Sequence, residues 1–283
     1  ADISDLKMTI ITNDPTKRYY YTLLFGDKYR VKIATRNVNI PGIQNFRDLG
    51  GYPSYPGKKQ MRWGMIYRSA EIDSLECYSR RELRNLGIKT LIDLRASSET
   101  GRQSPLQKEF NVVHIPLATG DMENILKGIR EEKIKSDTVY RMVEQMNRDL
   151  IDKYTTEYRQ IFDILLDKNS YPVVIHCSSG KGRTGIVSAL VLAALGINED
   201  IIMEDYRLSN DYFNIPSASK DAYQLPARSQ EAITTLFSAR EDFLNAAKEE
   251  AERRYGDIDS YLQKGIGLNK DEIKRLRSIL LSD

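Results

Sequence analysis

Hydrophobic and polar positions change their spacing several times along the chain, and each change predicts an element. Near-continuous apolar runs predict short buried strands, one ending near Tyr67 and others within 88–95, 111–117 and 171–177. Apolar residues recurring every three or four positions predict helices within 79–87, 121–167, 182–196 and from 198 onward. Strands that alternate with helices in this way predict an α/β fold, a mainly parallel central sheet flanked by helices.

The first forty residues follow a different pattern. They are rich in Tyr, Val, Ile and Thr, and they predict a small β-hairpin. The segment "IPGIQ" at 40–44 reads as a junction because Pro and Gly interrupt the pattern. We therefore expect residues 1–40 to form an N-terminal β-extension that packs on a main domain of residues 41–283 with a helical C-terminal part.

Composition narrows the class of protein. With 283 residues, of which 41% are hydrophobic, the chain is long enough to bury a core. With a net charge of only +2, the chain lacks the positive electrostatic field of nucleic-acid-binding proteins, so no nucleic-acid partner is expected. The longest apolar run, 186–195, is too short to cross a bilayer. The two cysteines, Cys77 and Cys177, are better explained as free thiols than as a bridge.

The segment "HCSSGKGRTG" at 176–185 carries the candidate chemistry. A strand that leads through a glycine-containing turn into a helix makes a nest of inward-facing N–H groups that binds anions. Gly180 and Gly182 permit the backbone angles and the close approach that such a nest needs. The nucleotide-binding P-loop pattern does not fit, because Lys181 is followed by glycine and arginine rather than by Ser or Thr.

A cysteine at the base of this nest predicts nucleophilic attack on phosphorus. The helix N-terminus and cationic neighbours would lower the pKa of Cys177, which favours the thiolate. Arg183, five residues further on, can hold two phosphoryl oxygens with its planar fork. Thr184 can donate its hydroxyl to the thiolate. The predicted phosphate-binding residues are Ser178, Ser179, Gly180, Lys181, Gly182 and Arg183.

The histidines have a smaller predicted role. His176 is expected to orient the loop through hydrogen bonds to the backbone rather than to act as a general base. Together with His114 it is one of only two histidines, too few for a cluster with metal-ligand spacing. The sequence therefore predicts neither a metal nor another cofactor.

Further segments accompany this loop in order along the chain. They are "NFRDLGG" (45–51), "YRSAE" (67–71), "IDLR" (92–95), "YTTEYRQIF" (154–162), "DYRLSNDYF" (205–213) and "YGDIDSYL" (255–262). With the His-Cys-x5-Arg-Thr form of the loop, the chain from about residue 45 onward resembles the bacterial tyrosine-phosphatase family of cysteine-dependent phosphatases, which has secreted mycobacterial and listerial members. The resemblance implies the phosphatase fold.

The resemblance also implies roles and substrates. Cys177 would be the nucleophile and Arg183 the phosphate clamp, and members accept phosphotyrosine, phosphoserine or phosphothreonine and phosphoinositides. One position departs from the family: relatives usually carry Asp where this chain has Gly182. The resulting "GKGRTG" is similar to the loop of a phosphoinositide phosphatase of the wider superfamily. Lys181 would then favour a highly phosphorylated headgroup, or simply attract anions.

The leaving oxygen needs a proton from a general acid on another segment. In the superfamily this is an Asp on a loop after a neighbouring strand, and Asp121, just past the predicted strand that ends at residue 117, is the favoured candidate. Asp121 would serve equally well as the N-cap of a helix beginning at residue 122. Asp93 and Asp48 are the reserve candidates.

Other residues are expected to support the loop rather than to react. The resemblance places Asn45, Arg47 and Asp48 beside the phosphate cradle. Arg95 either faces the mouth of the pocket or pairs with a carboxylate, and Asp93, unless it is the acid, pairs with an arginine. Cys77 is expected to have no role.

The sequence therefore predicts a metal-independent phosphomonoesterase that works through a phosphocysteine intermediate, most simply a protein-tyrosine phosphatase with broad specificity. The alternatives are a phosphoinositide or inositol-phosphate phosphatase and, in another class, a phosphate-binding module with weak catalysis. The absent initial Met and the exported relatives favour a secreted or periplasmic protein, with the cytoplasm as alternative. No oligomeric state is indicated.

Overall fold

The computed structural model describes residues 9–282 except 13, 15, 16, 27, 28, 56–58, 74, 101–104 and 220. At its centre is a five-stranded sheet with the order β3-β6-β9-β7-β8. The inner strands run parallel and β3 pairs antiparallel with β6 at one edge. The strands are β3 (Arg47–Asp48), β6 (Ile66–Ser69), β7 (Thr90–Asp93), β8 (Asn111–His114) and β9 (Val173–His176).

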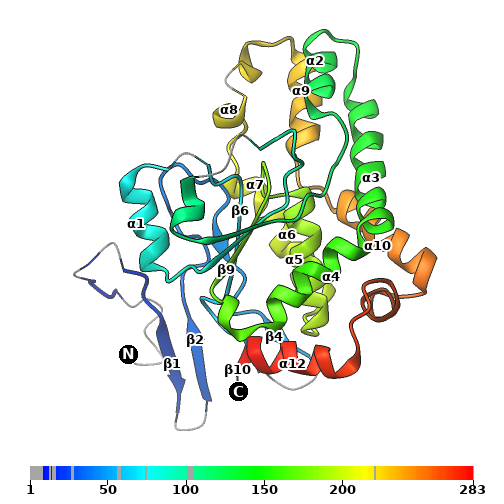
Figure 1. The fold of residues 1–283 in the computed structure, drawn as a ribbon. Coiled ribbons are helices and arrows are strands. Elements are labelled where there is room, and N and C mark those ends of the chain that lie inside the picture. The colour runs from blue at the N-terminus through cyan, green and yellow to red at the C-terminus, as the bar shows by residue number, and fades with distance from the viewer. Residues whose placement is uncertain are drawn as a thin grey trace.

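The side chains of β9 alternate between two buried layers. Val173 and Ile175 face the larger hydrophobic cluster, whereas Val174 faces the smaller one with Leu83 of α1 (Cys77–Asn85). Figure 1 shows α1 on one side of the sheet and α4 and α5 on the other. Because both faces are covered, the strand has to be apolar throughout, which explains its continuous hydrophobic run.

Helices make up most of the chain after β8. They are α2 (Met122–Arg130), α3 (Ser136–Lys153), α4 (Thr155–Leu166), α5 (Gly182–Ala194), α6 (Glu199–Arg207), α7 (Ser209–Tyr212), α8 (Ile215–Ala218), α9 (Ala227–Phe237), α10 (Glu241–Tyr255), α11 (Ile258–Ser260) and α12 (Lys270–Leu280). Shorter helical turns lie at Pro105–Lys108, Lys168–Ser170, Ala222–Gln224 and Tyr261–Gly265. In Figure 1, α2, α8, α9 and part of α3 form an upper layer above the sheet, and Ile125, Val139 and Ile233 share a separate hydrophobic cluster there.

The observed architecture confirms the predicted α/β fold with a mainly parallel sheet flanked by helices. All four predicted strands are present, each shorter than its apolar run. The predicted helical stretch 121–167 is divided into three helices, with breaks at residues 131–135 and at Tyr154. The helix before Gly87 ends as expected, because Gly87 takes a φ of +71° that favours glycine.

An antiparallel hairpin of β1 (Tyr21–Phe25) and β2 (Tyr29–Ile33) lies within the N-terminal segment. Figure 1 shows it at the lower left, apart from the central sheet. Two contacts attach the N-terminal segment to the main domain. The Trp63 indole donates to the carbonyl of Lys32 in β2 at 2.8 Å, and Arg18, which precedes β1, pairs with buried Asp48 at 2.9 Å. The first eight residues lie outside the described part of the chain, and the domain boundary near residue 40 stays a prediction.

A small antiparallel sheet joins distant parts of the sequence. It contains β4 (Pro53–Ser54), β5 (Lys59–Met61) and β10 (Leu281–Ser282), in the order β10-β5-β4. Leu281 is paired with Met61, so the end of the described chain lies beside an early segment of the main domain. Of the helices in the described part of the chain, none combines the length and the apolar character needed to span a bilayer.

Candidate active site

The loop 177–183 leaves the sheet at the carboxyl ends of three parallel strands. His176, the last residue of β9, is in register with Ser69 of β6 and with Asp93 of β7. The strands therefore end at one level, and α5 begins at Gly182, directly after the turn. This edge is where parallel α/β sheets bind ligands.

Cys177 lies at the base of this loop as a buried free thiol with 1% of its surface exposed. Burial raises the pKa of the thiol, but the Arg183 charge, the Thr184 hydroxyl and backbone N–H groups outweigh it, so the pKa lies below its ordinary value. Within the described residues the Thr184 hydroxyl has no other hydrogen-bond partner. These groups favour a nucleophilic thiolate.

The two loop glycines differ in what their surroundings allow. Gly180 has a φ of +68°, and a Cβ at this position would lie 2.4 Å from the carbonyl carbon of Ser69. The turn therefore packs directly on the end of β6, and only glycine fits. A Cβ on Gly182, in contrast, would meet nothing nearer than the Asn147 side-chain oxygen at 4.0 Å. Packing therefore does not explain why position 182 is a glycine.

The Arg183 guanidinium is held on one side by a carboxylate. Its Nη1 and Nη2 donate to Glu99 Oε2 and Oε1 at 2.5 and 2.8 Å. The Ser178 hydroxyl donates to Glu99 Oε1 at 2.6 Å and accepts from Arg183 Nη2 at 3.1 Å. Three side chains thus fix one another at the edge of the loop.

Sequence reasoning missed Glu99. It lies 84 positions before its partner Arg183, in a loop without a local pattern that marks it. Burial alone would raise the pKa of Glu99, but the bonds from Arg183 and Ser178 hold the pKa down at about 2. Glu99 is therefore an ionised partner that orients the guanidinium.

A buried network supports the loop from below. Asn45, at a φ of +57°, donates its side-chain N–H groups to the carbonyl oxygens of Ser179 and Gly180, each at 3.0 Å. Arg68 Nη2 donates to the same Gly180 oxygen at 2.8 Å. Arg47 donates to the Asn45 side-chain oxygen and so fixes its orientation.

Asp205 of α6 links the two arginines of this network. Its carboxylate accepts from Arg68 at 2.7 Å and from Arg47 at 3.3 Å, and all three side chains are buried. Burial alone would raise the pKa of Asp205, but the two guanidinium charges have the larger effect and lower this pKa to about 2. Neither Arg68 nor Asp205 was singled out from the sequence, although both lie in the segments "YRSAE" and "DYRLSNDYF" that carry the family resemblance.

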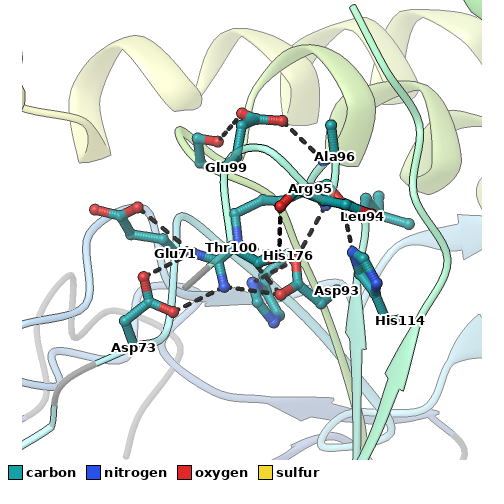
Figure 2. Close-up of polar contacts among 12 residues, drawn as sticks. Glu71, Asp73, Asp93, Leu94, Arg95, Ala96, Glu99, Thr100, His114 and His176 are labelled. Atoms are coloured by element: carbon teal, nitrogen blue, oxygen red, sulfur yellow. Dashed lines mark hydrogen bonds and ion pairs between the residues drawn. The ribbon is translucent and has the colours of Figure 1, made fainter. Parts of the chain in front are cut away.

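Arg95 lies in a cluster of carboxylates rather than at an open pocket mouth (Figure 2). It makes two bonds of 2.7 Å to Asp73 and one of 2.7 Å to Asp93, and only 3% of its side chain is exposed. The bonds to Arg95 hold the pKa of Asp93 below its usual value against the effect of burial. Of the two interpretations of Arg95, the structure shows the carboxylate pairing.

His176 is buried below the loop and beside Asp93, with 3.9 Å between its Nδ1 and Oδ1 of the carboxylate. Burial lowers the pKa of His176 to about 4, so the ring is neutral at physiological pH. Its carbonyl accepts from the Leu94 N–H at 2.9 Å and links the ends of β9 and β7. The ring nitrogen Nδ1 has no hydrogen-bond partner within the described residues, so the predicted role of the His176 ring in orienting the loop stays a prediction.

Asp48, predicted beside the loop, has its contacts elsewhere. Its carboxylate accepts from the N–H groups of Gly50 and Gly64, each at 2.7 Å, and pairs with Arg18. It therefore anchors the N-terminal segment.

The structure shows the capping arrangement for Asp121. Oδ1 accepts from the Asn124 backbone N–H at 3.0 Å and Oδ2 from the Asn124 side chain at 2.6 Å, at the start of α2. The neighbouring residues Thr119 and Met122 line the small cavity over the loop, but Asp121 does not.

The Lys181 ammonium lies beside two aromatic rings. Its Nζ lies 5.5 Å from the ring centre of Phe213 and 5.2 Å from that of Phe237, and the two rings stack on each other. The lysine is 4% exposed, and its Nζ has no hydrogen-bond partner within the described residues. Burial lowers the pKa of Lys181 to about 7, against the opposing effect of Cys177.

A cavity of about 80 Å³ lies over the loop. Cys177 and Arg183 line it from the sheet side, and Asn147 of α3 and Leu236 of α9 belong to the helices that cover it. Of the described residues that line it, none is Asp or Glu. The described residues also contain no group of three or more His, Cys, Asp or Glu that could hold a metal ion.

Several known proteins resemble this chain over most of its length. The triple specificity protein phosphatase PtpB of Mycobacterium tuberculosis is 29% identical, and the match covers 86% of this chain and 98% of PtpB. A putative tyrosine-protein phosphatase of Cupriavidus necator is 25% identical, with 82% and 85% covered.

Among solved structures, TpbA of P. aeruginosa in complex with phosphotyrosine matches 62% of this chain and 89% of its own, at 15% identity and a TM-score of 0.31. The Siw14 catalytic core matches 65% and 86%, at 17% identity and a TM-score of 0.33. The model of the tyrosine phosphatase family matches residues 38–282. The chain therefore belongs to the tyrosine phosphatase family and is a cysteine-dependent phosphatase.

Proposed function

We propose that this protein hydrolyses phosphotyrosine and, with broader specificity, other phosphomonoesters, with Cys177 as nucleophile and Arg183 as phosphate clamp. The observation that carries the proposal is the state of Cys177. Its thiol lies at the base of an anion-binding turn, and Arg183, Thr184 and loop amides lower its pKa. Such a thiolate is suited to attack a phosphorus atom held by the same groups.

In the first step, the Cys177 sulfur forms a bond to phosphorus and the bond to the ester oxygen breaks. The loop amides from Ser178 to Gly182 and the Arg183 guanidinium would hold the three equatorial oxygens, where charge spreads in the transition state. Glu99 already bonds both terminal nitrogens of the guanidinium and fixes its orientation, so phosphate would bind to the N–H groups of Arg183 that Glu99 leaves free.

In the second step, water attacks phosphorus, the sulfur–phosphorus bond breaks, and inorganic phosphate leaves with the thiolate restored. The Thr184 hydroxyl stabilises that thiolate as a leaving group.

We propose Asp121 as the acid that protonates the leaving oxygen and later accepts the proton of water. The other carboxylates near the loop are poor donors, because arginine bonds keep the pKa of Glu99 and of Asp93 low. Residues on either side of Asp121 line the cavity. To reach a leaving group, the carboxylate must give up its cap on α2.

A phosphoinositide or inositol-phosphate substrate is the second candidate. The buried ammonium of Lys181 supports it, since this group has no hydrogen-bond partner among the described residues and lies on the cavity beside the loop. Released from the two phenylalanine rings, it would meet a second phosphate next to the one being cleaved.

The catalytic assignment is tested with Cys177→Ser and the matched variant Cys77→Ser. Rapid acid quenching followed by mass spectrometry should find a phosphoryl group on Cys177 in the parent protein and in Cys77→Ser. The Cys177→Ser protein should fold, bind phosphate and show no turnover. Full activity in Cys177→Ser would refute the covalent route, whereas phosphate binding without turnover in the parent protein would indicate a binding module.

The substrate class is tested by comparing kcat/KM for a phosphotyrosine peptide and for a soluble phosphoinositide. The protein-phosphatase proposal expects the peptide to be the better substrate. A higher value for the phosphoinositide, lost in Lys181→Met, would transfer the assignment to the second candidate.

A further inference from the structure

A second cavity, of about 560 Å³, lies among α5, α6, α10 and α11. Within the described part of the chain it shares no lining residue with the small cavity over the phosphate loop. The helices concerned pack against one another at the side of the sheet that carries α5 (Figure 1). A hollow of this size falls within the range of small-molecule sites, roughly 300–1,000 Å³.

The floor of this cavity is apolar. Ile186, Ala189, Leu190 and Ala193 are spaced three, four and seven positions along α5 and therefore share one helix face. Alanines on this face and Ala247 of α10 leave the space that larger side chains would fill. A hydrophobic body can bury its surface here.

The rim carries an excess of negative charge. Four carboxylates line the opening, from Glu199, Glu252, Asp257 and Asp259, against the single ammonium of Lys248. Lys248 is already paired with Glu199 and lies 3.7 Å from Glu252. The local field therefore favours a cation and disfavours an anion such as a phosphate ester or a fatty acid.

We propose that this cavity is a binding site for a small amphiphilic cation, with an aliphatic body on the α5 face and an ammonium head at the carboxylate rim. The site is separate from the reaction at Cys177, so it does not depend on the proposed function. It does contact the same framework: Ile186 follows Arg183 by one turn of α5, and Met203 precedes Tyr206 by one turn of α6.

Binding is tested by titrating octyltrimethylammonium into protein labelled at the isoleucine and methionine methyl groups. The expected result is saturable shifts at Met203, Ile202 and Ile258, whose side chains line the cavity, and none at Met61, which belongs to the small sheet. Octanoate and octanol, which share the alkyl chain, should bind more weakly because they lack the positive head.

Two kinds of variant separate the cavity from general surface binding. Ala189→Phe fills the floor and should abolish the shifts. The double substitution Glu252→Gln with Asp259→Asn removes two rim charges. It should weaken the affinity for the cation by about threefold to tenfold and leave the affinity for octanol unchanged. Glu231→Gln, an exposed glutamate of α9 outside the cavity lining, is the matched control and should bind like the parent protein.

The rim variant keeps the test decisive if Ala189→Phe proves unstable, since it alters only exposed groups. Equal affinity for octanoate and octyltrimethylammonium would overturn the proposal. So would an affinity for the cation that the rim substitutions leave unchanged, or an absence of saturable shifts at the lining methyl groups.

Discussion

Arg183 and Glu99 form a two-point ion pair, with 2.5 Å between Nη1 and Oε2 and 2.8 Å between Nη2 and Oε1. The pair fixes the orientation of the planar guanidinium before any phosphate binds. The Glu99 carboxylate also accepts a hydrogen bond from the Ser178 hydroxyl, and this additional contact holds it in place. Glu99 is thus a positioning residue that acts through Arg183.

Glu99→Gln keeps one acceptor for Arg183 but removes the charge and the second acceptor. We expect kcat/KM for an aryl phosphate to fall about tenfold, the equivalent of one charge-assisted hydrogen bond. Steady-state kinetics give the value. Glu109→Gln, which removes an ion pair with Arg84 on the surface at 2.7 Å, should leave kcat/KM unchanged; equal losses in the two variants would mean that Glu99 acts only on stability.

Gly180→Ala should disrupt the loop. The new Cβ would be forced to within 2.4 Å of the Ser69 backbone at a φ of +68°, and we expect a loss of about 2–4 kcal/mol in the free energy of unfolding. Gly182→Ala, where the nearest atom is 4.0 Å away, should stay within about 0.5 kcal/mol of the parent protein. Urea denaturation measures both, and similar losses would mean that the Ser69 contact is not the cause.

The buried lysine predicts a pH dependence that differs between substrates. The pKa of Lys181 is lowered to about 7, so its charge is present below that pH and is lost as the pH rises through it. The ratio of kcat/KM for a phosphoinositide to that for a phosphotyrosine peptide should therefore fall as the pH rises from 6 to 8, roughly one pH step on either side of that pKa.

Two variants bracket this effect. In Lys181→Arg the side chain stays charged, so the ratio of kcat/KM for the phosphoinositide to that for the peptide should not change with pH. In Lys181→Met the same ratio should be low and constant. Lys168→Met, at an exposed position after α4, is the control and should keep the parent profile. A parent ratio that is flat with pH would contradict a role for this ammonium.

Asp121→Asn tests the proposed acid. Esters with poor leaving groups should be slowed by about 10²–10⁴-fold, because they need the proton most, whereas aryl esters with good leaving groups should lose much less. Asn124→Ala, which removes only the side-chain partner of the Asp121 cap, should affect both kinds of ester alike. Equal slowing of both by Asp121→Asn would assign the acid to another residue.

The buried pairs of Asp205 predict a stability effect. Asp205→Asn leaves Arg47 and Arg68 without their counter-charge, and we expect a loss of about 3–5 kcal/mol. Because the pKa of Asp205 is lowered to about 2, its contribution is present above the unfolded value near 4 and is lost as the pH falls between the two. Asp221→Asn removes an exposed pair with Arg130 and should cost at most about 1 kcal/mol.

The strands, the helix after the loop and the roles suggested for Cys177 and Arg183 could be predicted from local sequence. Apolar runs and glycine positions are local signals, and the loop holds the proposed nucleophile and the proposed clamp within seven residues. Asn45 was expected beside the loop only through the family resemblance, and the structure shows its bonds to Ser179 and Gly180.

What the sequence did not reveal depends on contacts between distant segments. Glu99 reaches Arg183 across 84 positions, and Asp205 reaches Arg68 across 137. The aromatic environment of Lys181 needs Phe213 and Phe237 to meet over the loop. Asp121 is the instructive case, since one residue type serves both as an acid and as a helix cap. The structure shows its cap bonds to Asn124, whereas its role as the acid stays a proposal.

The small sheet that pairs Leu281 with Met61 affects how the chain reaches this structure. Ser282 donates to the Gln60 carbonyl from 222 positions away, and closing so long a span has a large entropic cost. The small sheet can therefore form only once residues 281–282 are available to pair with β5. A protease cut before α12 would leave β5 as an open edge and release Leu276, Ile279 and Leu280 from the core, and an exposed strand edge is a template for aggregation.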